Sequence, residues 1–230
     1  MQLFYTPHAA SGAIVALEEQ EAHHAQVVRL QSGDAIHLMD GKGKLYVGRL
    51  VELTRKTASV QIGDCIQSAS EPSSLHIAIA PTKNIDRMEW FCEKVTELGV
   101  AAIYPIICQR SERKELRNER LEKVILSAAK QSQSLFLPKL FPAQTFRQIL
   151  TMPFEGTRCI AECAQPHVEF SSLVKAGQPH LIMIGPEGDF TPEETSLALT
   201  AGFQAVSLGA SRLRTETAGI YAAAILRSAG

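Results

Sequence analysis

Two different patterns of apolar and polar residues divide the chain. Within residues 1–70, short stretches of partly alternating apolar residues are separated by turns, which is typical of strands with one buried face. Asp40-Gly41 stands between two such stretches and predicts a β-hairpin over 34–53. Another strand is expected at 57–66 and a short helix at 18–30, ending near Gly33. Together these elements predict a small β-barrel domain over residues 1–70.

From residue 75 onward, short apolar strands alternate with helices. Strands are predicted at 75–80, 100–108, 157–163, 180–185 and 204–209, and helices at 84–99, 119–132, 171–177, 191–202 and 215–228. Such alternation predicts an α/β domain with a mostly parallel sheet and helices on both faces. We place this domain at 75–230, after a polar linker at 67–74.

Two of these helices carry strong end signals. Asn84 stands in N-cap position and Gly99 follows the end of the first helix. The segment from Thr191 has a capping box with Glu194 and a proline at the first helical position.

The composition, with 45% hydrophobic and 20% charged residues, is ordinary for a globular protein. No apolar run approaches the roughly 20 residues that span a bilayer, and the first residues lack the pattern of a signal peptide. We therefore expect a cytoplasmic protein without membrane contact. The five cysteines are scattered through expected strands and helices, which argues against a disulfide framework.

Charge is unevenly distributed along the chain. The net charge of −1 argues against nucleic-acid binding through bulk charge, yet residues 76–147 carry 12 basic and 8 acidic residues. The basic stretch at 110–123 fits a solvated helix face with pairs such as Glu119 and Lys123, and it equally fits a contact with RNA.

Three strand-to-loop junctions are candidates for chemistry, because parallel sheets bind ligands at the carboxyl ends of their strands. They lie at 160–164, 184–190 and 208–218. The second contains Gly185-Pro186-Glu187-Gly188, whose glycines would let backbone groups approach a ligand closely. A simple turn that needs two glycines explains the same four residues.

Several familiar sites are excluded. The chain has no phosphate-binding G-x-x-x-x-G-K-[ST] or G-x-G-x-x-G motif and no G-x-S-x-G elbow. Cys159, Cys163 and His167 lack the second ligand pair of a zinc site, so we expect no metal.

In order and spacing, a series of motifs resembles the RsmE family of SPOUT-class methyltransferases. They are "DRMEWFCEKVTELGV", "SER" at 111–113, "QS" at 131–132, "IGPEG" and "LRTETA", with "HHAQVVRLQSGDAIHLMDGKG" near the start. The likeness covers nearly the whole chain. It implies methylation of N(3) of a uridine in 16S rRNA of the 30S subunit, with S-adenosylmethionine as cofactor. It also implies a homodimer, an N-terminal PUA-like β-barrel and a C-terminal trefoil knot.

The resemblance assigns roles by position. Implied cofactor-binding residues are Glu162, Gly185, Pro186, Glu187, Gly188, Leu208, Gly209, Leu213, Thr215, Thr217 and Ala218. Implied catalytic residues are Arg214, which would stabilise the uridine anion, Glu216 as a proton acceptor, and Arg113. Expected RNA-binding residues are Arg29, Lys42, Lys44, Arg87, Arg110, Arg113 and Arg212. Helix capping also explains the polar residues at 214–217.

The chain departs from the family pattern at several positions. Asp189 stands where the family usually has glycine, and Lys130, Gln131, Ser132 and Ser134 stand where it has a Glu-Gln-Ser run followed by arginine. Ser211 replaces an arginine and Arg212 a commonly apolar residue, so Arg212 is a candidate substitute for the missing charge. Two alternatives remain open: a methyltransferase for another RNA position, and a non-catalytic RNA-binding or ribosome-assembly module.

Overall fold

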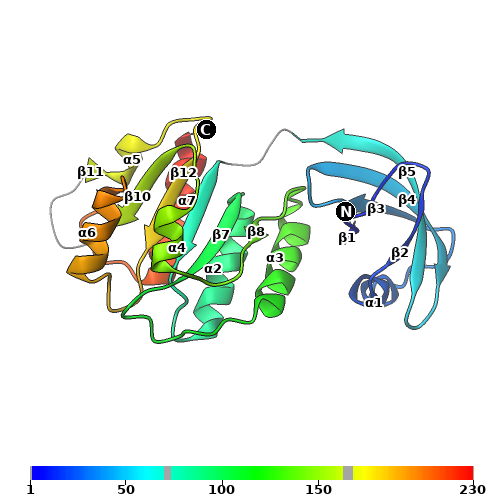
Figure 1. Cartoon of the computed structure of the whole chain (residues 1–230). Coiled ribbons are helices and arrows are strands. Elements are labelled where there is room, and N and C mark those ends of the chain that lie inside the picture. The colour runs from blue at the N-terminus through cyan, green and yellow to red at the C-terminus, as the bar shows by residue number, and fades with distance from the viewer. Residues whose placement is uncertain (1, 70–73, 163–167, 230) are drawn as a thin grey trace. The chain divides into compact units, whose positions relative to one another are not determined.

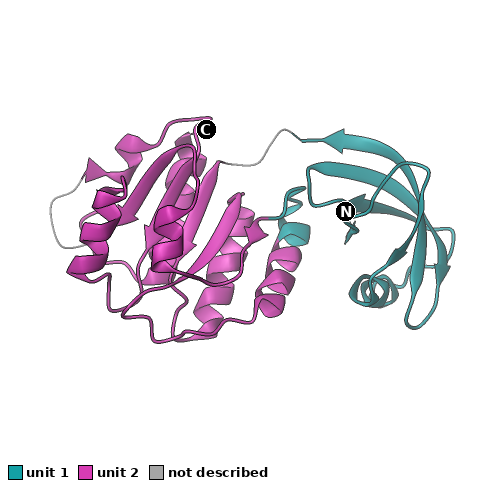
Figure 2. Cartoon of the chain, viewed as in Figure 1, with its two compact units in different colours: residues 1–72, 129–137 teal, residues 73–128, 138–230 magenta. Residues whose placement is uncertain are grey.

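The computed structural model describes residues 2–69, 74–162 and 168–229. The chain forms two compact units (Figure 2): residues 1–72 with 129–137, and residues 73–128 with 138–230. None of the described helices is long and apolar enough to cross a membrane.

The first unit is a five-stranded sheet with one helix (Figure 1). Its elements are β1 (Leu3–Tyr5), β2 (Ile14–Leu17), α1 (Glu19–Val27), β3 (Ala35–Met39), β4 (Lys44–Leu53) and β5 (Ala58–Ser68), with strand order β1-β3-β4-β5-β2. The predicted hairpin is confirmed, since β3 and β4 pair antiparallel. The Asp40 carboxylate stabilises its turn by accepting hydrogen bonds from the amides of Lys42 and Lys44, at 2.7 and 3.0 Å.

The end of α3 (Asn118–Ser132) belongs to this unit although it comes much later in the chain. Lys130 Nζ donates to both carboxylate oxygens of Glu21 at 2.8 and 2.9 Å, and the Tyr5 amide donates to the same carboxylate at 3.1 Å. Glu21 is only 3% exposed, so its charge needs these partners. A segment far along the sequence therefore completes the polar core of the first unit.

The second unit is a parallel sheet (Figure 1). Its described strands run in the order β11-β13-β10-β12-β6-β7-β8, and β9 pairs with the end of β7. Their bounds are β6 (Leu75–Ile79), β7 (Ala102–Ile107), β8 (Lys139–Leu140), β9 (Gln144–Thr145), β10 (Thr157–Ala161), β11 (Val168–Glu169), β12 (His180–Ile184) and β13 (Gln204–Ser207). The five apolar strands predicted from the sequence form its centre.

All but one of the helices described in the second unit begin within one residue of the starts predicted from the sequence. They are α2 (Ile85–Glu97), α4 (Phe146–Thr151), α5 (Phe170–Leu173), α6 (Pro192–Thr200) and α7 (Thr215–Ala229), besides most of α3. Asn84 caps α2 by accepting the Asp86 amide at 3.0 Å, and Thr191 and Glu194 form the expected capping box on α6. Four described elements of this unit were not predicted, namely β8, β9, β11 and α4, and each has six residues or fewer.

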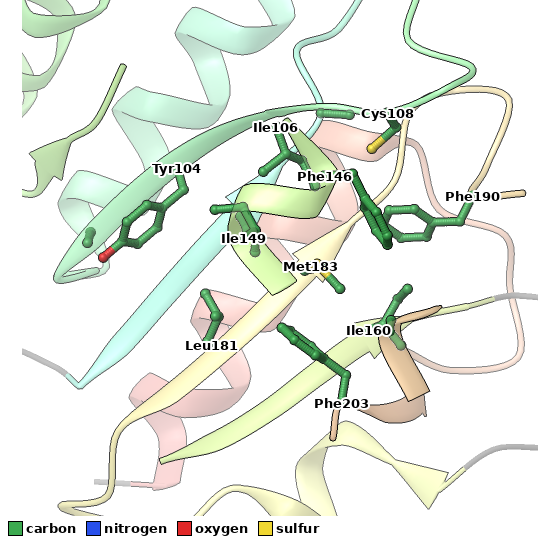
Figure 3. Packing of buried hydrophobic residues seen from close by; sticks show 14 residues of the cluster. Tyr104, Ile106, Cys108, Phe146, Ile149, Ile160, Leu181, Met183, Phe190 and Phe203 are labelled. Carbon is green, nitrogen blue, oxygen red and sulfur yellow. The ribbon is translucent and has the colours of Figure 1, made fainter. Parts of the chain in front are cut away.

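Both faces of the parallel sheet are buried, which is why its strands are apolar throughout. On one face, Tyr104 and Ile106 of β7 and Leu181 of β12 pack with Phe146 and Ile149 of α4, as Figure 3 shows. Side chains of the same sheet that point to the other face, such as Ile77, Ile79 and Ile182, are equally buried. The sheet therefore forms the centre of a three-layer unit.

On the second face, α7 approaches α2 and β6 closely. A Cβ atom at Gly219 would lie 2.5 Å from the Phe91 ring and 3.2 Å from Ile79 Cδ1. No side chain fits at this position without displacing the ring. Ala222 and Ala223 continue this small-residue contact surface and are also buried.

His76 of β6 is a half-buried titratable group within the aromatic part of the core. Its Nδ1 lies 3.2 Å from the Tyr104 hydroxyl, and its ring centroid lies 5.1 Å from that of Phe154. Burial lowers the pKa of His76 below its ordinary value of 6.5.

We predict that the second unit loses stability as the pH falls below about 6.5. There the unfolded chain binds a proton on His76 while the folded state resists it, so the free energy of unfolding decreases until the pH reaches the lower folded pKa. Urea titrations at pH 7.5 and 5.5, followed by the fluorescence of Trp90, the single tryptophan, measure this loss. His76→Phe should reduce it, whereas substitution of the exposed His23 by Gln should not. An equal pH dependence in H76F and wild type would contradict the prediction.

Candidate active site

A cavity of about 930 Å³ opens at the carboxyl ends of three neighbouring strands, β10, β12 and β13. Its wall comes from the junctions predicted from the sequence, with β11 and the start of α7. The lining residues are Ala161, Glu162, Glu169, Ile184, Gly185, Pro186, Glu187, Asp189, Ser207, Leu208, Gly209, Ala210, Ser211, Arg212, Leu213, Arg214, Thr215 and Ala218. This volume is typical of sites for small-molecule ligands and cofactors.

The loop after β12 forms one wall, and a hydrogen bond joins it to the last helix. Thr215 Oγ1 donates to the carbonyl of Gly185 at 3.0 Å. The Asp189 amide donates to the carbonyl of Pro186 at 2.8 Å and closes the turn. Asp189 has φ +64° and accepts the amide of Phe190 on its own carboxylate at 2.8 Å. Aspartate is among the few residues that tolerate this left-handed conformation, which explains how it stands where the family usually has glycine.

The segment from Leu208 to Arg214 forms another part of the wall and leads into α7. Gly209 has φ +105°, and its amide donates to Ser207 Oγ at 3.0 Å. The Ala218 amide donates to the carbonyl of Arg214 at 2.8 Å, so α7 begins directly after Arg214. The amides of the first helical turn, at 215–217, therefore have no acceptor within the helix and are available to a ligand.

Carboxylates outnumber guanidinium groups in the wall of the cavity. Glu162, Glu169, Glu187 and Asp189 face Arg212 and Arg214 around the same space. This balance favours a ligand that carries positive charge. Arg214 is exposed and forms no ion pair with any residue that the structure describes, so its charge is available to a substrate.

The structure brings together most of the predicted cofactor residues and leaves two outside. Gly188 and Thr217 do not line the cavity, whereas the other nine do. Arg110 Nη1 donates to the carbonyl of Gly188 at 2.8 Å, and its side chain lies 3.3 Å from where a Gly188 Cβ would stand. Gly188 thus allows a close approach of Arg110 to the backbone of the cavity loop.

Four of the predicted charged residues near the site also lie outside the cavity, namely Arg87, Arg110, Arg113 and Glu216. Arg113 donates from Nε to the carbonyl of Thr82 at 3.1 Å and from Nη2 to that of Lys83 at 2.8 Å. Glu216 is buried, and its carboxylate lies 3.8 Å from Arg87 Nε. Of the predicted catalytic residues, the cavity itself contains Arg214.

The expected RNA-binding residues of the first unit are all exposed. Arg29 follows the end of α1 with φ +60°, while Lys42 and Lys44 lie at the β3–β4 hairpin. The Asp40 carboxylate fixes the backbone at Lys42 and Lys44. The side chains of all three basic residues are exposed to solvent.

Seven lining residues had no individual role assigned from the sequence, although five of them lie within the three predicted junctions. They are Ala161, Glu169, Ile184, Asp189, Ser207, Ala210 and Ser211. Six lie beside residues assigned by the resemblance, so adjacency along the chain was a usable signal. Glu169 had no such signal, because it belongs to a two-residue strand.

Of the three residues considered for a zinc site in the sequence, the structure describes Cys159. Cys159 is buried in β10, and burial raises the pKa of its thiol to about 12. The thiol therefore stays protonated at neutral pH. Cys163 and His167 lie outside the described residues. Within the described ranges no group of three or more His, Cys, Asp or Glu side chains could hold a metal ion.

Comparison with known proteins identifies relatives along the whole chain. Residues 69–227 match the family described as RNA methyltransferase domain, and residues 17–63 match RNA methyltransferase PUA domain. Ribosomal RNA small subunit methyltransferase E of Synechocystis sp. is 32% identical over 94% of this chain and 74% of its own length.

Solved structures are similar to this chain over nearly its whole length. A probable rRNA-methyltransferase from Porphyromonas gingivalis is 37% identical, with a TM-score of 0.88 over 100% of this chain and 98% of that one. A ribosomal RNA small subunit methyltransferase E from Neisseria gonorrhoeae bound to S-adenosylmethionine is 32% identical, with a TM-score of 0.89 over 99% and 97%.

Fold and cavity together define an RNA methyltransferase of the SPOUT class, an α/β trefoil-knot domain joined to an N-terminal PUA-like β-barrel. The predicted fold class is confirmed. Within that class, the chain belongs to the ribosomal RNA small subunit methyltransferase E family, RsmE.

The cavity fits the cofactor S-adenosylmethionine of this family. Its excess of carboxylates suits a ligand that carries a sulfonium and an ammonium group. The first amides of α7, which have no acceptor within the helix, suit its polar acceptors. Gly209, with no atom within 4 Å of a Cβ position, leaves its wall open to a flat adenine ring.

We predict that Thr215→Val weakens cofactor binding about five- to thirtyfold, as expected for loss of a part-buried hydrogen bond. The substitution keeps the shape of the side chain but removes the donor to Gly185, so the two walls of the cavity lose their connection. Isothermal titration with S-adenosylmethionine measures the change. Thr217→Val is the matched control, because Thr217 does not line the cavity. Unchanged affinity in T215V would show that this hydrogen bond does not support the site.

Proposed function

We propose that this protein methylates N(3) of a specific uridine in 16S rRNA within the small ribosomal subunit, in the cytoplasm. The observation that carries the proposal is the cavity at the carboxyl ends of β10, β12 and β13, which combines a cofactor-sized space with Arg214 at its wall. The relatives named ribosomal RNA small subunit methyltransferase E support the choice of RNA.

Arg214 would stabilise the negative charge that develops on the uridine. The N(3) atom becomes a good nucleophile only as its proton leaves, and a guanidinium in a partly enclosed site favours the resulting anion. Bound S-adenosylmethionine supplies the methyl group on a sulfonium. The protein's remaining contribution is to hold N(3) in line with that methyl group, which requires an unpaired or extruded base.

Other basic residues would hold the RNA. Arg212 lines the cavity and offers the charge missing at Ser211. Arg110 and Arg113 each donate to backbone carbonyls near the cavity and retain further N–H groups for phosphate. We assign residues 1–70 an RNA-binding role through Arg29, Lys42 and Lys44, and residues 75–230 the methyl transfer.

We predict that Arg214→Ala lowers kcat by about 10²- to 10³-fold, the usual cost of removing one group that stabilises developing negative charge. The assay is methylation of 30S subunits that lack the modification, followed by nucleoside mapping of the 16S rRNA. Cofactor affinity should not decrease, because Arg214 repels rather than attracts a cationic ligand.

Arg212→Ala is the matched control at the same cavity wall, and a smaller loss there would assign the main role to Arg214. Near-normal turnover of R214A would remove that role. Binding of S-adenosylmethionine without any methylation of 30S subunits by wild type would instead favour another RNA position or a non-catalytic module.

We also propose that the protein is a homodimer formed through α2 and α7. These helices pack against each other, and each carries a large exposed apolar side chain, Trp90 at 45% and Tyr221 at 46%. A second copy of the chain would cover both, and the start of α7 would then bring the cavity close to the partner.

The double substitution W90E/Y221E should convert the dimer to a monomer in light scattering after size-exclusion chromatography, because two buried carboxylates would oppose association. Ile66→Glu, at an equally exposed apolar position of the first unit, is the control. A monomeric wild type at micromolar concentration would refute the proposal.

A further inference from the structure

Arg87 and Glu216 meet outside the cavity, at the N-terminal ends of α2 and α7. Arg87 Nε lies 3.8 Å from Glu216 Oε1, and the two side chains are 39% and 6% exposed. Glu216 Oε2 is buried and accepts no hydrogen bond from any residue that the structure describes. A buried carboxylate therefore depends on a guanidinium that is itself open to solvent.

The helical phase of α7 explains why Glu216 does not face the cavity. Thr215 and Ala218, three positions apart, share the face that lines it. Glu216 and Gly219 share the adjacent face, where Gly219 lies against Phe91 of α2. Glu216 thus points toward α2, three positions before Gly219, which lies at the contact between the two helices.

A series of contacts also leads from the cavity to Arg87 through α2. Glu187 lines the cavity and accepts the amide of Lys83 on Oε1 at 3.0 Å. The next residue, Asn84, caps α2, and its carbonyl accepts the Arg87 amide at 3.2 Å. The two carbonyl contacts of Arg113 hold the same loop from its other side.

The two routes form a closed ring. One runs from Gly185 through Thr215 to Glu216, the other from Glu187 through the cap of α2 to Arg87, and they meet at the ion pair. Gly185 and Glu187 belong to one turn of the cavity wall. The position of Arg87 is therefore linked to that wall twice, through Glu216 and through the start of α2.

We propose that Glu216 is a positioning residue, which holds Arg87 as a ligand for an RNA phosphate beside the methyl-transfer cavity. The proposal rests on the function proposed above. Glu216 engages the Nε edge of Arg87, which leaves the Nη groups and the solvent-exposed face for the planar, bidentate contact that arginine makes with phosphate. The start of α7 is a favourable place for the carboxylate, since a helix N-terminus stabilises negative charge.

The test compares Arg87→Ala, Arg87→Lys and Glu216→Gln, with Arg227→Ala as control. Arg227 is an exposed arginine at the far end of the same helix, so it matches the change in net charge. For each variant, isothermal titration gives the affinity for S-adenosylmethionine. Methylation of 30S subunits lacking the modification gives kcat, KM and the dependence of KM on salt.

We expect R87A and E216Q to raise KM for the 30S subunit about tenfold, while kcat and cofactor affinity stay within about twofold of wild type. The salt dependence of KM should be smaller in R87A, by the equivalent of about one released counterion. R87K should recover part of the loss, since it keeps the charge but not the planar geometry. The double variant R87A/E216Q should bind no worse than R87A, because Glu216 acts through Arg87.

Several outcomes would overturn the inference. A fall in kcat of E216Q at unchanged KM would place Glu216 in the chemistry, and loss of cofactor binding would make it a support of the cavity. An equal effect of R227A would show that only net charge matters. Circular dichroism shows whether E216Q folds. If it does not fold, R87A and R87K test the phosphate contact instead. A normal KM in both variants would refute the role of Arg87 in binding RNA. An inactive wild type would instead refute the proposed function itself.

Discussion

The hydrogen bond between Thr215 and the carbonyl of Gly185 joins the last helix to the loop of a strand thirty positions earlier. The segment from Leu208 to Arg214 can form a cavity wall only if α7 is held in place at its start. Small residues make this possible, since Gly219 lets the helix approach Phe91 and Ile79 more closely than any side chain would allow. An alanine there would overpack the contact at a cost of about 1–3 kcal/mol. The cofactor site therefore depends on how well α7 packs against α2 and β6.

Much of the fold could be predicted because its signals are local. The apolar run of β12, the Asn84 cap of α2 and the capping box of α6 each depend on a few neighbouring residues. The short elements α4, β8 and β9 carry too few residues for periodicity to be detected. The pairing of Lys130 with Glu21 joins residues 109 positions apart, and no pattern along the chain indicates it.

The sequence predicted which loops form the candidate site, but not which of their charged side chains reach the cavity. Three junctions after parallel strands had to lie at one edge of the sheet, and they do. Arg113, Arg110 and Glu187, in contrast, use their side chains on backbone groups of neighbouring loops. Such contacts depend on which carbonyl or amide a fold leaves without a partner, and that is decided by tertiary structure. A motif can therefore contain the right residue types while only some of them reach the ligand.

A protein of net charge −1 can act on RNA because its charges are separated in space. Four carboxylates and two arginines line the cavity, a balance suited to a cationic cofactor. Arginine and lysine side chains gather on the neighbouring loops after β6 and β7, where Arg113, Arg110 and Lys83 lie. Glu216 lies between these regions, buried at the start of a helix whose other face lines the cavity. A carboxylate in that position can orient a cation toward RNA without adding negative charge to the surface that RNA contacts, because burial separates it from the solvent.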